Sequence, residues 1–526
     1  MTGLVRCVRW RLPALLALLL TGCSPAGAGT ELVYGLTLSP SGIDPHLNAS
    51  SELGIPLSSV YDTLVFQDPE TGAFVPGLAE SWEISPDGRI YTFHLRRDVR
   101  FHDGTPFDAA AVVANIEYVL DPDHHSQKAA FMLGPLEGVE AEGEDTVLIR
   151  LKQPFAPLLD SLAQVYLGMA SPAALKEWGP TDYGFHQVGT GPYRFVEYIP
   201  NDRLLLARNE EYAWAPSVYR SRNARLDSIL FRFYEDPATR GLALQTGAVH
   251  IMGEIPPNEA ARLEETGEFV LDPVPIPGQP LQLLFNTRRP PTDDVRVRQA
   301  LVQAVDRERI VETVFGAYSP VAQGPLSAVT RGNPSATAFA GYDVPGANHL
   351  LDEAGWVRQG EGTRRKDGAD LVVLMVVPTW GSNPEVAQLV KVAWESLGAK
   401  VELTVAPGFG PLKEAQAGGE YHAIGINFFG RDPDLLRSFY STQGLYNWTG
   451  IVDAEVDVLL DEAAQEFKDE AARSVLYQRL AEWIRDEALI LPIRDYVNLV
   501  VAGSRVSGLR FSSQGWFPFL IDANLD

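Results

Sequence analysis

The sequence contains almost no cysteine, since Cys7 and Cys23 are the only two among its 526 residues. Both lie close to the N-terminus, so the rest of the chain can form no disulfide bond and shows no zinc-type spacing of cysteine and histidine. With 45% apolar and 21% charged residues, a chain of this length can bury a core that is stable without cross-links. We therefore expect two or three globular domains.

Positive charge is also scarce in this chain. Its 43 lysine and arginine residues are outnumbered by 68 aspartate and glutamate residues, and the formal net charge is -25. Removal of the arginine-containing leader described below would make the chain more acidic still. Because such a surface repels phosphate backbones, we expect no nucleic-acid partner.

Long apolar runs are missing too, and the N-terminal one, Leu12–Leu20, is too short to span a bilayer comfortably. It follows a basic stretch, residues 6–11, in the pattern of an export signal. Its end, Leu20-Thr21-Gly22-Cys23, resembles the bacterial lipobox, in which the cysteine thiol receives the lipid. We predict a signal peptide over residues 1–22, a lipid anchor on Cys23 and a tether over 23–30. A buried cysteine after an ordinary signal is the alternative.

Motifs for catalysis and cofactors are equally absent. The sequence has no G-x-S-x-G, H-E-x-x-H or Walker motif. His124 and His125, the one adjacent histidine pair, stand beside aspartates and a proline, which favours a solvated loop over a metal site. The glycine-rich turn Gly189–Tyr193 lacks the lysine of a phosphate loop. We expect no catalytic residue, no metal and no cofactor.

The most informative stretch that is present runs from Pro76 to Leu120. Its turn Ser85-Pro86-Asp87-Gly88 and the alternation that follows predict a hairpin over Trp82–Leu95. Asp108 then precedes apolar residues at helical spacing, which predicts a capped helix from Ala109.

The same stretch resembles the signature region of the family 5 extracellular solute-binding proteins, the dipeptide, oligopeptide and nickel receptors of ABC importers. Later segments resemble further landmarks of that family in the same order, so the resemblance covers nearly the whole mature chain. These segments are Val188–Phe195, Leu284–Thr287, Asp294–Leu301 and Asp432–Asp434.

The resemblance implies an α/β fold of the class II periplasmic-binding-protein type, cluster C, with two lobes and an extra small domain. The strand, helix and strand expected at Leu371–Val377, Pro384–Leu397 and Val401–Val405 independently indicate an α/β unit with a largely parallel sheet. The implied division is domain I over residues 31–65, 189–284 and 491–526, domain II over 66–188, and domain III over 285–490.

Two finer expectations concern the connections between these domains. We expect a hinge near Phe285 and a return crossing at Ile490–Pro492. Asp294, Arg296 and Arg298 are expected to hold the start of the helix after the hinge, because alternating charges beside an apolar helix usually cap it or lie on its solvated face.

The implied function is that of an exported, lipid-anchored and monomeric receptor. It would bind a peptide or peptide-like solute between its lobes and present it to the transmembrane subunits of an ABC permease. A nickel chelate or another organic anion is the alternative ligand. An extracytoplasmic hydrolase is the alternative of another class.

Two positions depart from the pattern of the peptide-binding members. Phe429 stands where they carry an aspartate for the ligand's ammonium group, and Trp380 stands where dipeptide receptors carry an arginine for its carboxylate. Both anchors of a zwitterionic dipeptide are therefore expected to be missing, so plain dipeptides should bind weakly.

The remaining candidate site is aromatic with one basic residue. We predict that it binds a ligand with an apolar or planar body and an anionic group, and that Arg431 supplies the cation. Ordinary core packing is the alternative for each aromatic residue, and a helix cap is the favoured role for Asp432 and Asp434. The predicted ligand-binding residues are Trp380, Phe428, Phe429, Arg431, Asp432, Tyr446, Asn447 and Trp448.

Overall fold

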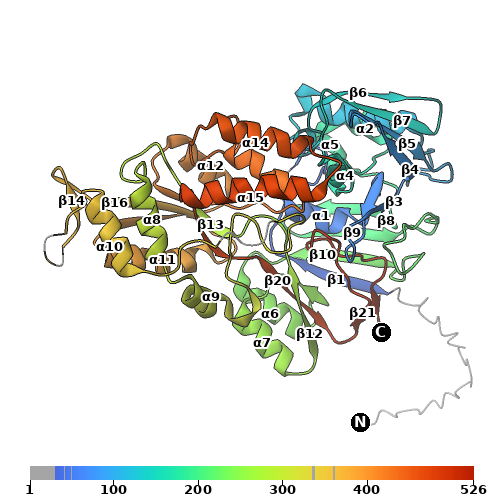
Figure 1. Ribbon diagram of the computed structural model, residues 1–526. Coiled ribbons are helices and arrows are strands. Elements are labelled where there is room, and N and C mark those ends of the chain that lie inside the picture. Colours follow the sequence, from blue (N-terminus) through green and yellow to red (C-terminus); the bar gives the residue numbers. More distant parts are fainter. Residues whose placement is uncertain (1–29, 41, 49, 334–337, 359, 361) are drawn as a thin grey trace, which may run out of the picture.

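The computed structural model describes residues 30–526 except 41, 49, 334–337, 359 and 361. The predicted signal peptide, Cys23 and nearly all of the tether lie outside the described residues. Three large sheets and the helices around them make up the fold (Figure 1). Within the described part of the chain, no helix has the length and apolar character needed to cross a membrane.

The largest sheet has seven strands drawn from the beginning, middle and end of the sequence. Strand β1 pairs in parallel with β10 and β11, and the other pairs are antiparallel. The strands, in spatial order, are β12 (Phe269–Pro275), β20 (Val497–Gly503), β11 (Ile251–Met252), β1 (Glu31–Leu36), β10 (Ser228–Phe233), β9 (Arg203–Arg208) and β8 (Tyr193–Ile199). Helices α6 (Pro237–Gln245) and α7 (Pro257–Glu265) lie beside β11 and β12.

A four-stranded antiparallel sheet contains the hairpin predicted from the sequence. Its order is β4 (Ala79–Ile84), β5 (Ile90–Leu95), β7 (Thr146–Leu151) and β6 (Leu136–Ala141). At the turn, Gly88 N donates to Ser85 O over 2.8 Å, and Gly88 takes the positive φ of 71° that glycine tolerates. Asp108 accepts from Ala111 N over 2.8 Å and caps α2 (Ala109–Leu120). The predicted hairpin and capped helix are both confirmed.

The third sheet has five strands and contains the predicted strand–helix–strand unit. Strands β17 and β18 pair in parallel with β16, and α11 (Asn383–Ser396) packs on β16 and β17, which confirms the strand–helix–strand unit. The sheet is mixed rather than largely parallel, because β13 pairs antiparallel with both β18 and β19. The spatial order is β17 (Lys400–Ala406), β16 (Val372–Pro378), β18 (Ala423–Gly425), β13 (Leu281–Phe285) and β19 (Ile490–Arg494).

Two large hydrophobic cores mark two lobes, and a smaller third cluster lies between α6, α7 and β20 on the seven-stranded sheet. The seven-stranded and four-stranded sheets share one hydrophobic core, which includes Phe231 and Phe93. The five-stranded sheet has a separate core, which includes Leu283 and Trp394. We call these the first lobe and the second lobe. The second lobe also holds α8 (Val295–Gln303), α9 (Arg307–Phe315), α10 (Val344–Glu353), α12 (Phe409–Gly418), α13 (Arg437–Tyr440), α14 (Ala454–Gln465) and α15 (Glu470–Asp486).

The chain passes between the lobes twice, at residues 276–280 and 495–496. The expected hinge at Phe285 and the expected crossing at Ile490–Pro492 are wrong by several residues, because they fall inside β13 and β19 of the five-stranded sheet. An apolar run reveals a strand but not the sheet in which it pairs. The division into three domains remains our prediction.

The charged residues at the start of α8 support the helix. Asp294 caps it by accepting from Arg296 N over 2.9 Å and pairs with the Arg296 guanidinium. Arg298 is only 2% exposed and donates to Glu487 O, Thr292 O and Asp293 O. The expected structural role is confirmed, although Arg298 is buried and does not lie on a solvated face.

Candidate functional site

A cavity of about 140 Å³, which we call the aromatic cavity, lies between the two lobes. The first lobe contributes α3 (Ala129–Met132), α4 (Leu158–Leu162) and their flanking residues, and the second contributes residues 428–446. Its walls are mostly apolar rings and chains, with a few polar groups. The apolar residues are Phe131, Met132, Phe155, Pro157, Phe428, Phe429, Leu435, Phe439, Leu445 and Tyr446, and the polar ones include Gln127, Lys128, Asp160, Gln164 and Asp432.

Three rings of the second lobe form one wall. The Phe428 ring lies 4.5 Å from that of Tyr446 and 5.4 Å from that of Phe439, centre to centre. The crossing segment 276–280 holds Phe428 in place, because Gln279 Oε1 accepts from Phe428 N over 3.0 Å and Gln279 N donates to Phe428 O over 2.8 Å. Such a fixed aromatic wall suits the planar or apolar body of a ligand.

The opposite wall carries two charged groups that sequence reasoning missed. Asp160 is 5% exposed; its Oδ2 accepts from Gln164 Nε2 over 2.9 Å, whereas Oδ1 has no partner among the described residues. Burial, and then the nearby Asp432, raise the pKa of Asp160 to about 7. The Lys128 ammonium lies 3.8 Å from the centre of the Tyr166 ring, and burial lowers its pKa to about 8. A buried oxygen without a partner can accept a hydrogen bond from a ligand.

A signal for Asp160 was present in the sequence. It is the only charged residue in the apolar run Phe155–Leu162. A lone charged residue on a short, mostly apolar helix is unusual in a structural core.

Arg431, the predicted cation, does not line the aromatic cavity. Its Nη1 approaches Ser513 O at 3.4 Å, and its Nε has no partner in the described part of the chain. Burial lowers the pKa of Arg431, while the charge of Asp160 opposes this shift. Lys128 is therefore the cation that the structure places on the cavity wall.

Asp432 has the capping role that the sequence favoured. It accepts from Asp434 N over 2.8 Å at the start of the 3-10 turn Pro433–Leu436. Its two carboxylate oxygens also receive both terminal nitrogens of Arg473, at 2.7 and 2.8 Å. Asp432 thus stabilises the loop below the aromatic cavity, and its negative charge is already paired.

Asn447 and Trp448 face the interior of the second lobe. Asn447 Nδ2 donates to Ser441 O and Ile451 O, which braces the loop around it. Trp448 is 2% exposed and belongs to the core of the second lobe. Of the eight predicted residues, the structure thus gathers Phe428, Phe429, Asp432 and Tyr446 at the aromatic cavity.

Trp380 lines a second and larger cavity, of about 430 Å³, next to the connections between the lobes. We call it the hinge cavity. Arg240 and Glu254 of the first lobe, Trp380 of the second lobe, and Arg494 and Tyr496 at the crossing all line it. The Phe429 ring packs on those of Tyr496 and Trp516, at 4.9 and 5.3 Å. Phe429 lines the aromatic cavity and Tyr496 lines the hinge cavity, so their contact joins the walls of the two cavities.

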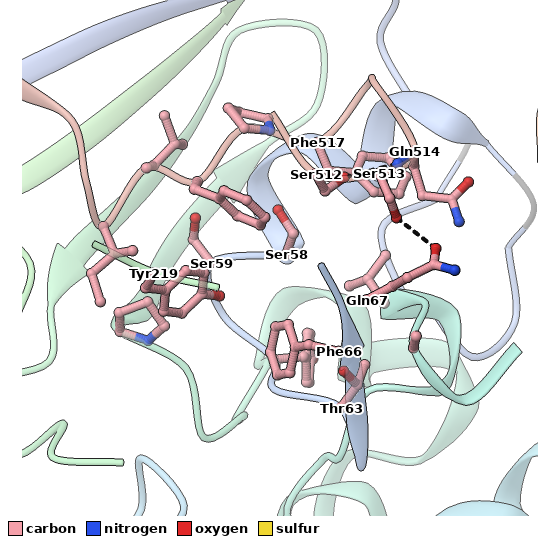
Figure 2. Close-up of a pocket in the computed structure, with 18 residues that line it drawn as sticks. Ser58, Ser59, Thr63, Phe66, Gln67, Tyr219, Ser512, Ser513, Gln514 and Phe517 are labelled. Carbon is pink, nitrogen blue, oxygen red and sulfur yellow. Dashed lines mark hydrogen bonds between the residues drawn. The ribbon is translucent and has the colours of Figure 1, made fainter. Parts of the chain in front are cut away.

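A third pocket, of about 60 Å³, joins β2 (Val65–Gln67) to the C-terminal loop. Figure 2 shows Ser513 Oγ donating to Gln67 Oε1, over 2.8 Å, while Phe66 and Tyr219 close the pocket from one side. This volume is about that of a few water molecules. We assign it to packing of the C-terminal loop.

Comparisons with known proteins agree with this geometry. The family described as "Bacterial extracellular solute-binding proteins, family 5 Middle" matches residues 73–450. The glutathione-binding protein GsiB of Pectobacterium atrosepticum is 32% identical over 339 residues, which cover 63% of this chain and 63% of that protein.

Two solved structures share the fold over nearly the whole chain. NikA from Brucella suis in complex with Fe(III)-EDTA is 26% identical with a TM-score of 0.84, and the match covers 94% of this chain and 100% of that one. DppA from Helicobacter pylori in complex with the peptide STSA is 25% identical with a TM-score of 0.80, over 94% and 98% of the two chains. The two-lobe α/β fold predicted from the sequence is confirmed.

Proposed function

Because the chain belongs to the family 5 bacterial extracellular solute-binding proteins, we propose that it captures a solute between its lobes and presents it to the permease of an ABC importer. The aromatic cavity carries this proposal, since its walls come from different lobes: Asp160 from the first, Phe428 and Tyr446 from the second. A solute that contacts both walls stabilises the closed arrangement that a permease recognises.

The chemistry of the aromatic cavity supports a peptide-like solute. Its rings would hold an apolar side chain, the unpartnered Asp160 oxygen would accept from an ammonium or amide group, and Lys128 would face a carboxylate. The similar proteins named above bind glutathione or a peptide. Phe429 and Trp380 supply no ionic anchor, so in this proposal Asp160 and Lys128 replace them, and the apolar walls favour solutes with a large apolar body over plain dipeptides.

A chelate or other organic anion is the second candidate solute. The Lys128 ammonium on the cavity wall favours it, and the similar NikA structure holds Fe(III)-EDTA. Calorimetric titration with Ni-EDTA separates this candidate from the peptide-like one, because only a receptor for chelates should bind it.

Native mass spectrometry of protein purified without denaturation tests the proposal first, because a solute held in a closed cleft is expected to copurify. Calorimetric titration of unliganded protein with dipeptides, longer peptides, aromatic carboxylates and Ni-EDTA then ranks these four classes of solute by affinity. Asp160→Asn should weaken binding of an ammonium-bearing peptide at least tenfold, a change of about 1.4 kcal/mol. Asp123→Asn, an exposed change outside the cavity, is the matched control.

Two results would contradict this proposal. One is equal affinity of the Asp160→Asn and Asp123→Asn variants for every solute in the panel. The other is a solute that leaves the protein chemically changed, which would favour the extracytoplasmic hydrolase.

We further propose that the mature protein acts outside the cytoplasm as a monomer anchored by lipid on Cys23, on the strength of the Leu20-Thr21-Gly22-Cys23 sequence. Cys23→Ala should release it from membranes into the soluble fraction. A variant that still pellets with membranes in high salt would refute the lipid anchor.

A further inference from the structure

The connection between β9 and β10 carries three exposed arginine residues, in a chain whose formal net charge is -25. We call residues 219–226 the arginine loop, after Arg220, Arg222 and Arg225. Their side chains form no ion pair or hydrogen bond with another residue that the structure describes. Unpaired positive charge gathered on one loop of so acidic a protein indicates an anionic partner.

The arginine loop has a fixed shape, because the first lobe holds it from below. Asp522 Oδ1 accepts from Ser221 N over 2.7 Å and from Arg220 N over 2.9 Å. Two apolar residues of the loop, Ala224 and Leu226, are buried in the core of the first lobe. The loop is thus packed through its apolar side chains, while its arginine side chains stay exposed.

The acidic residues around the arginine loop are mostly paired with other arginine residues. The pairs are Asp227–Arg208, Glu210–Arg208, Glu211–Arg194 and Asp522–Arg510, at 2.8, 2.8, 3.2 and 3.0 Å. Glu31 accepts from Ser228 Oγ over 3.2 Å and has no ion pair among the described residues. Three unpaired positive charges against one negative charge leave this part of the surface basic.

The same loop lies beside the first described residue of the chain. Thr30 N donates to Asp227 Oδ2 over 2.7 Å, and Asp227 N donates to Thr30 O over 2.9 Å. Asp227 is separated from Arg225 by a single residue. The predicted anchor, Cys23, precedes Thr30 by seven residues, and a chain of that length spans at most about 25 Å. A lipid on Cys23 would therefore keep the arginine loop close to the membrane at a high effective concentration.

We propose that the arginine loop is a docking surface for the anionic headgroups of the membrane in which the protein is anchored. Each guanidinium group would bind a lipid phosphate through its fork of N–H donors. The inference rests on the proposed lipid anchor of Cys23 and goes beyond it, because it assigns the side of the receptor that faces the membrane. None of the three arginine residues lines the aromatic cavity, the hinge cavity or the third pocket, so docking leaves the walls of all three uncovered.

Fluorescence transfer between the arginine loop and the membrane tests this proposal on the lipid-anchored protein in vesicles. Its Cys23 thiol is acylated, so Ser221→Cys supplies the single thiol for a donor dye and keeps the backbone bond to Asp522. The acceptor is a dye-labelled lipid. We expect more transfer in phosphatidylcholine vesicles with about 30% phosphatidylglycerol than in phosphatidylcholine alone, because each arginine should favour contact with an anionic surface about fivefold. Sodium chloride at about 0.5 M should abolish the difference.

A loop variant and a matched control assign the effect to the arginine residues. The loop variant carries Arg220→Gln, Arg222→Gln and Arg225→Gln. It should shift the equilibrium between docked and free loop about 100-fold and so reduce transfer in anionic vesicles to the level in neutral ones. The control variant makes the same change of net charge at three exposed positions of the second lobe, Arg288→Gln, Arg309→Gln and Arg479→Gln. It should leave transfer unchanged, and thermal unfolding confirms that both variants fold.

Two results would overturn the inference. One is equal transfer in the two kinds of vesicle. The other is a loop variant that matches the wild type in anionic vesicles, and loss of transport in such a variant would assign the arginine loop to an acidic face of the permease instead.

The lipid anchor fails separately from the docking surface. A mature protein whose N-terminal peptide carries no lipid by mass spectrometry would refute the anchor. Flotation of that unanchored protein with anionic vesicles would then decide the inference. Lower recovery of the loop variant than of the wild type would support the docking surface, and equal recovery would overturn it.

Discussion

Asp432 at the aromatic cavity and the two charged residues of the hinge cavity, Arg494 and Glu254, are held in opposite ways. Beneath the aromatic cavity, Asp432 is paired with both terminal nitrogens of Arg473, so this charge is satisfied before any solute arrives. In the hinge cavity, Arg494 and Glu254 are held by rings, hydroxyl groups and backbone only. A buried charge in a direct ion pair supports the fold, whereas one held by neutral groups adds much less to its stability.

This contrast teaches where each kind of residue is expected to matter. Loss of a paired residue should reduce stability strongly, and loss of one without a direct ion pair should reduce it little. The predictions below test that separation.

The largest effect is expected for Arg473→Ala. It leaves the Asp432 carboxylate buried without a partner, which should lower the free energy of unfolding by about 3 to 5 kcal/mol. Guanidinium-induced unfolding measures this change. Arg479→Ala on the exposed face of the same helix, α15, is the control and should stay within about 0.5 kcal/mol of the wild type. Equal losses in the free energy of unfolding for the two variants would show that the Asp432–Arg473 pair does not stabilise the fold.

The second prediction concerns the pH dependence caused by Asp160. Its pKa is raised to about 7 in the folded protein, so between about pH 4 and 7 the folded state holds a proton that the unfolded state has released. This contribution to stability is therefore present at low pH and is lost as the pH rises through 7, with a slope that approaches about 1.4 kcal/mol per pH unit.

Comparison with Asp160→Asn isolates that contribution, since other buried carboxyl groups such as Glu52 shift in the same direction. From pH 5 to 7 the wild type should lose stability relative to Asp160→Asn. The free energy of unfolding of Asp123→Asn should change with pH in the same way as that of the wild type over this range. A constant difference between the wild type and Asp160→Asn would mean that Asp160 is not protonated in the folded protein.

Local sequence patterns predicted the parts of the fold that depend on near neighbours. The turn at Gly88, the cap at Asp108 and the strand–helix–strand around α11 each follow from residues a few positions apart. The crossings between the lobes were misplaced because β13 and β19 are apolar strands whose sheet is chosen by long-range pairing. No short window of sequence contains that information.

The candidate site, like the fold, was predicted from the sequence only in part. Phe428 and Tyr446 were found because they lie near a family landmark, but Trp448 looked equivalent in sequence and is a core residue. Asp160 was marked in the sequence as a lone carboxylate in an apolar run, but its place opposite those rings, like that of Lys128, depends on the meeting of the two lobes. The hinge cavity was harder still, as its charged residues come from segments more than 200 positions apart.

The third prediction is that Arg494→Met changes the free energy of unfolding by less than about 2 kcal/mol, although Arg494 is only 5% exposed. The variant loses two ring contacts and the bond to Ser319 but also removes a buried charge that has no direct ion pair among the described residues. Chemical unfolding beside Arg473→Ala measures the comparison. A loss for Arg494→Met as large as that for Arg473→Ala would mean that Arg494 is a structural residue and would erase the contrast between the two cavities.

The smallest effects are expected at the cations near the aromatic cavity. Lys128→Met should weaken binding of phenylacetate about tenfold, or about 1.4 kcal/mol, because it removes the ammonium group on the wall of the aromatic cavity. Arg431→Met should change the affinity less than about twofold, because Arg431 is directed toward Ser513 and does not line the cavity. Calorimetric titration at pH 7 keeps Lys128 charged, since its pKa is lowered only to about 8. The reverse ranking would restore Arg431 as the anion-binding residue predicted from the sequence and would show that a bound solute draws its guanidinium into the cavity.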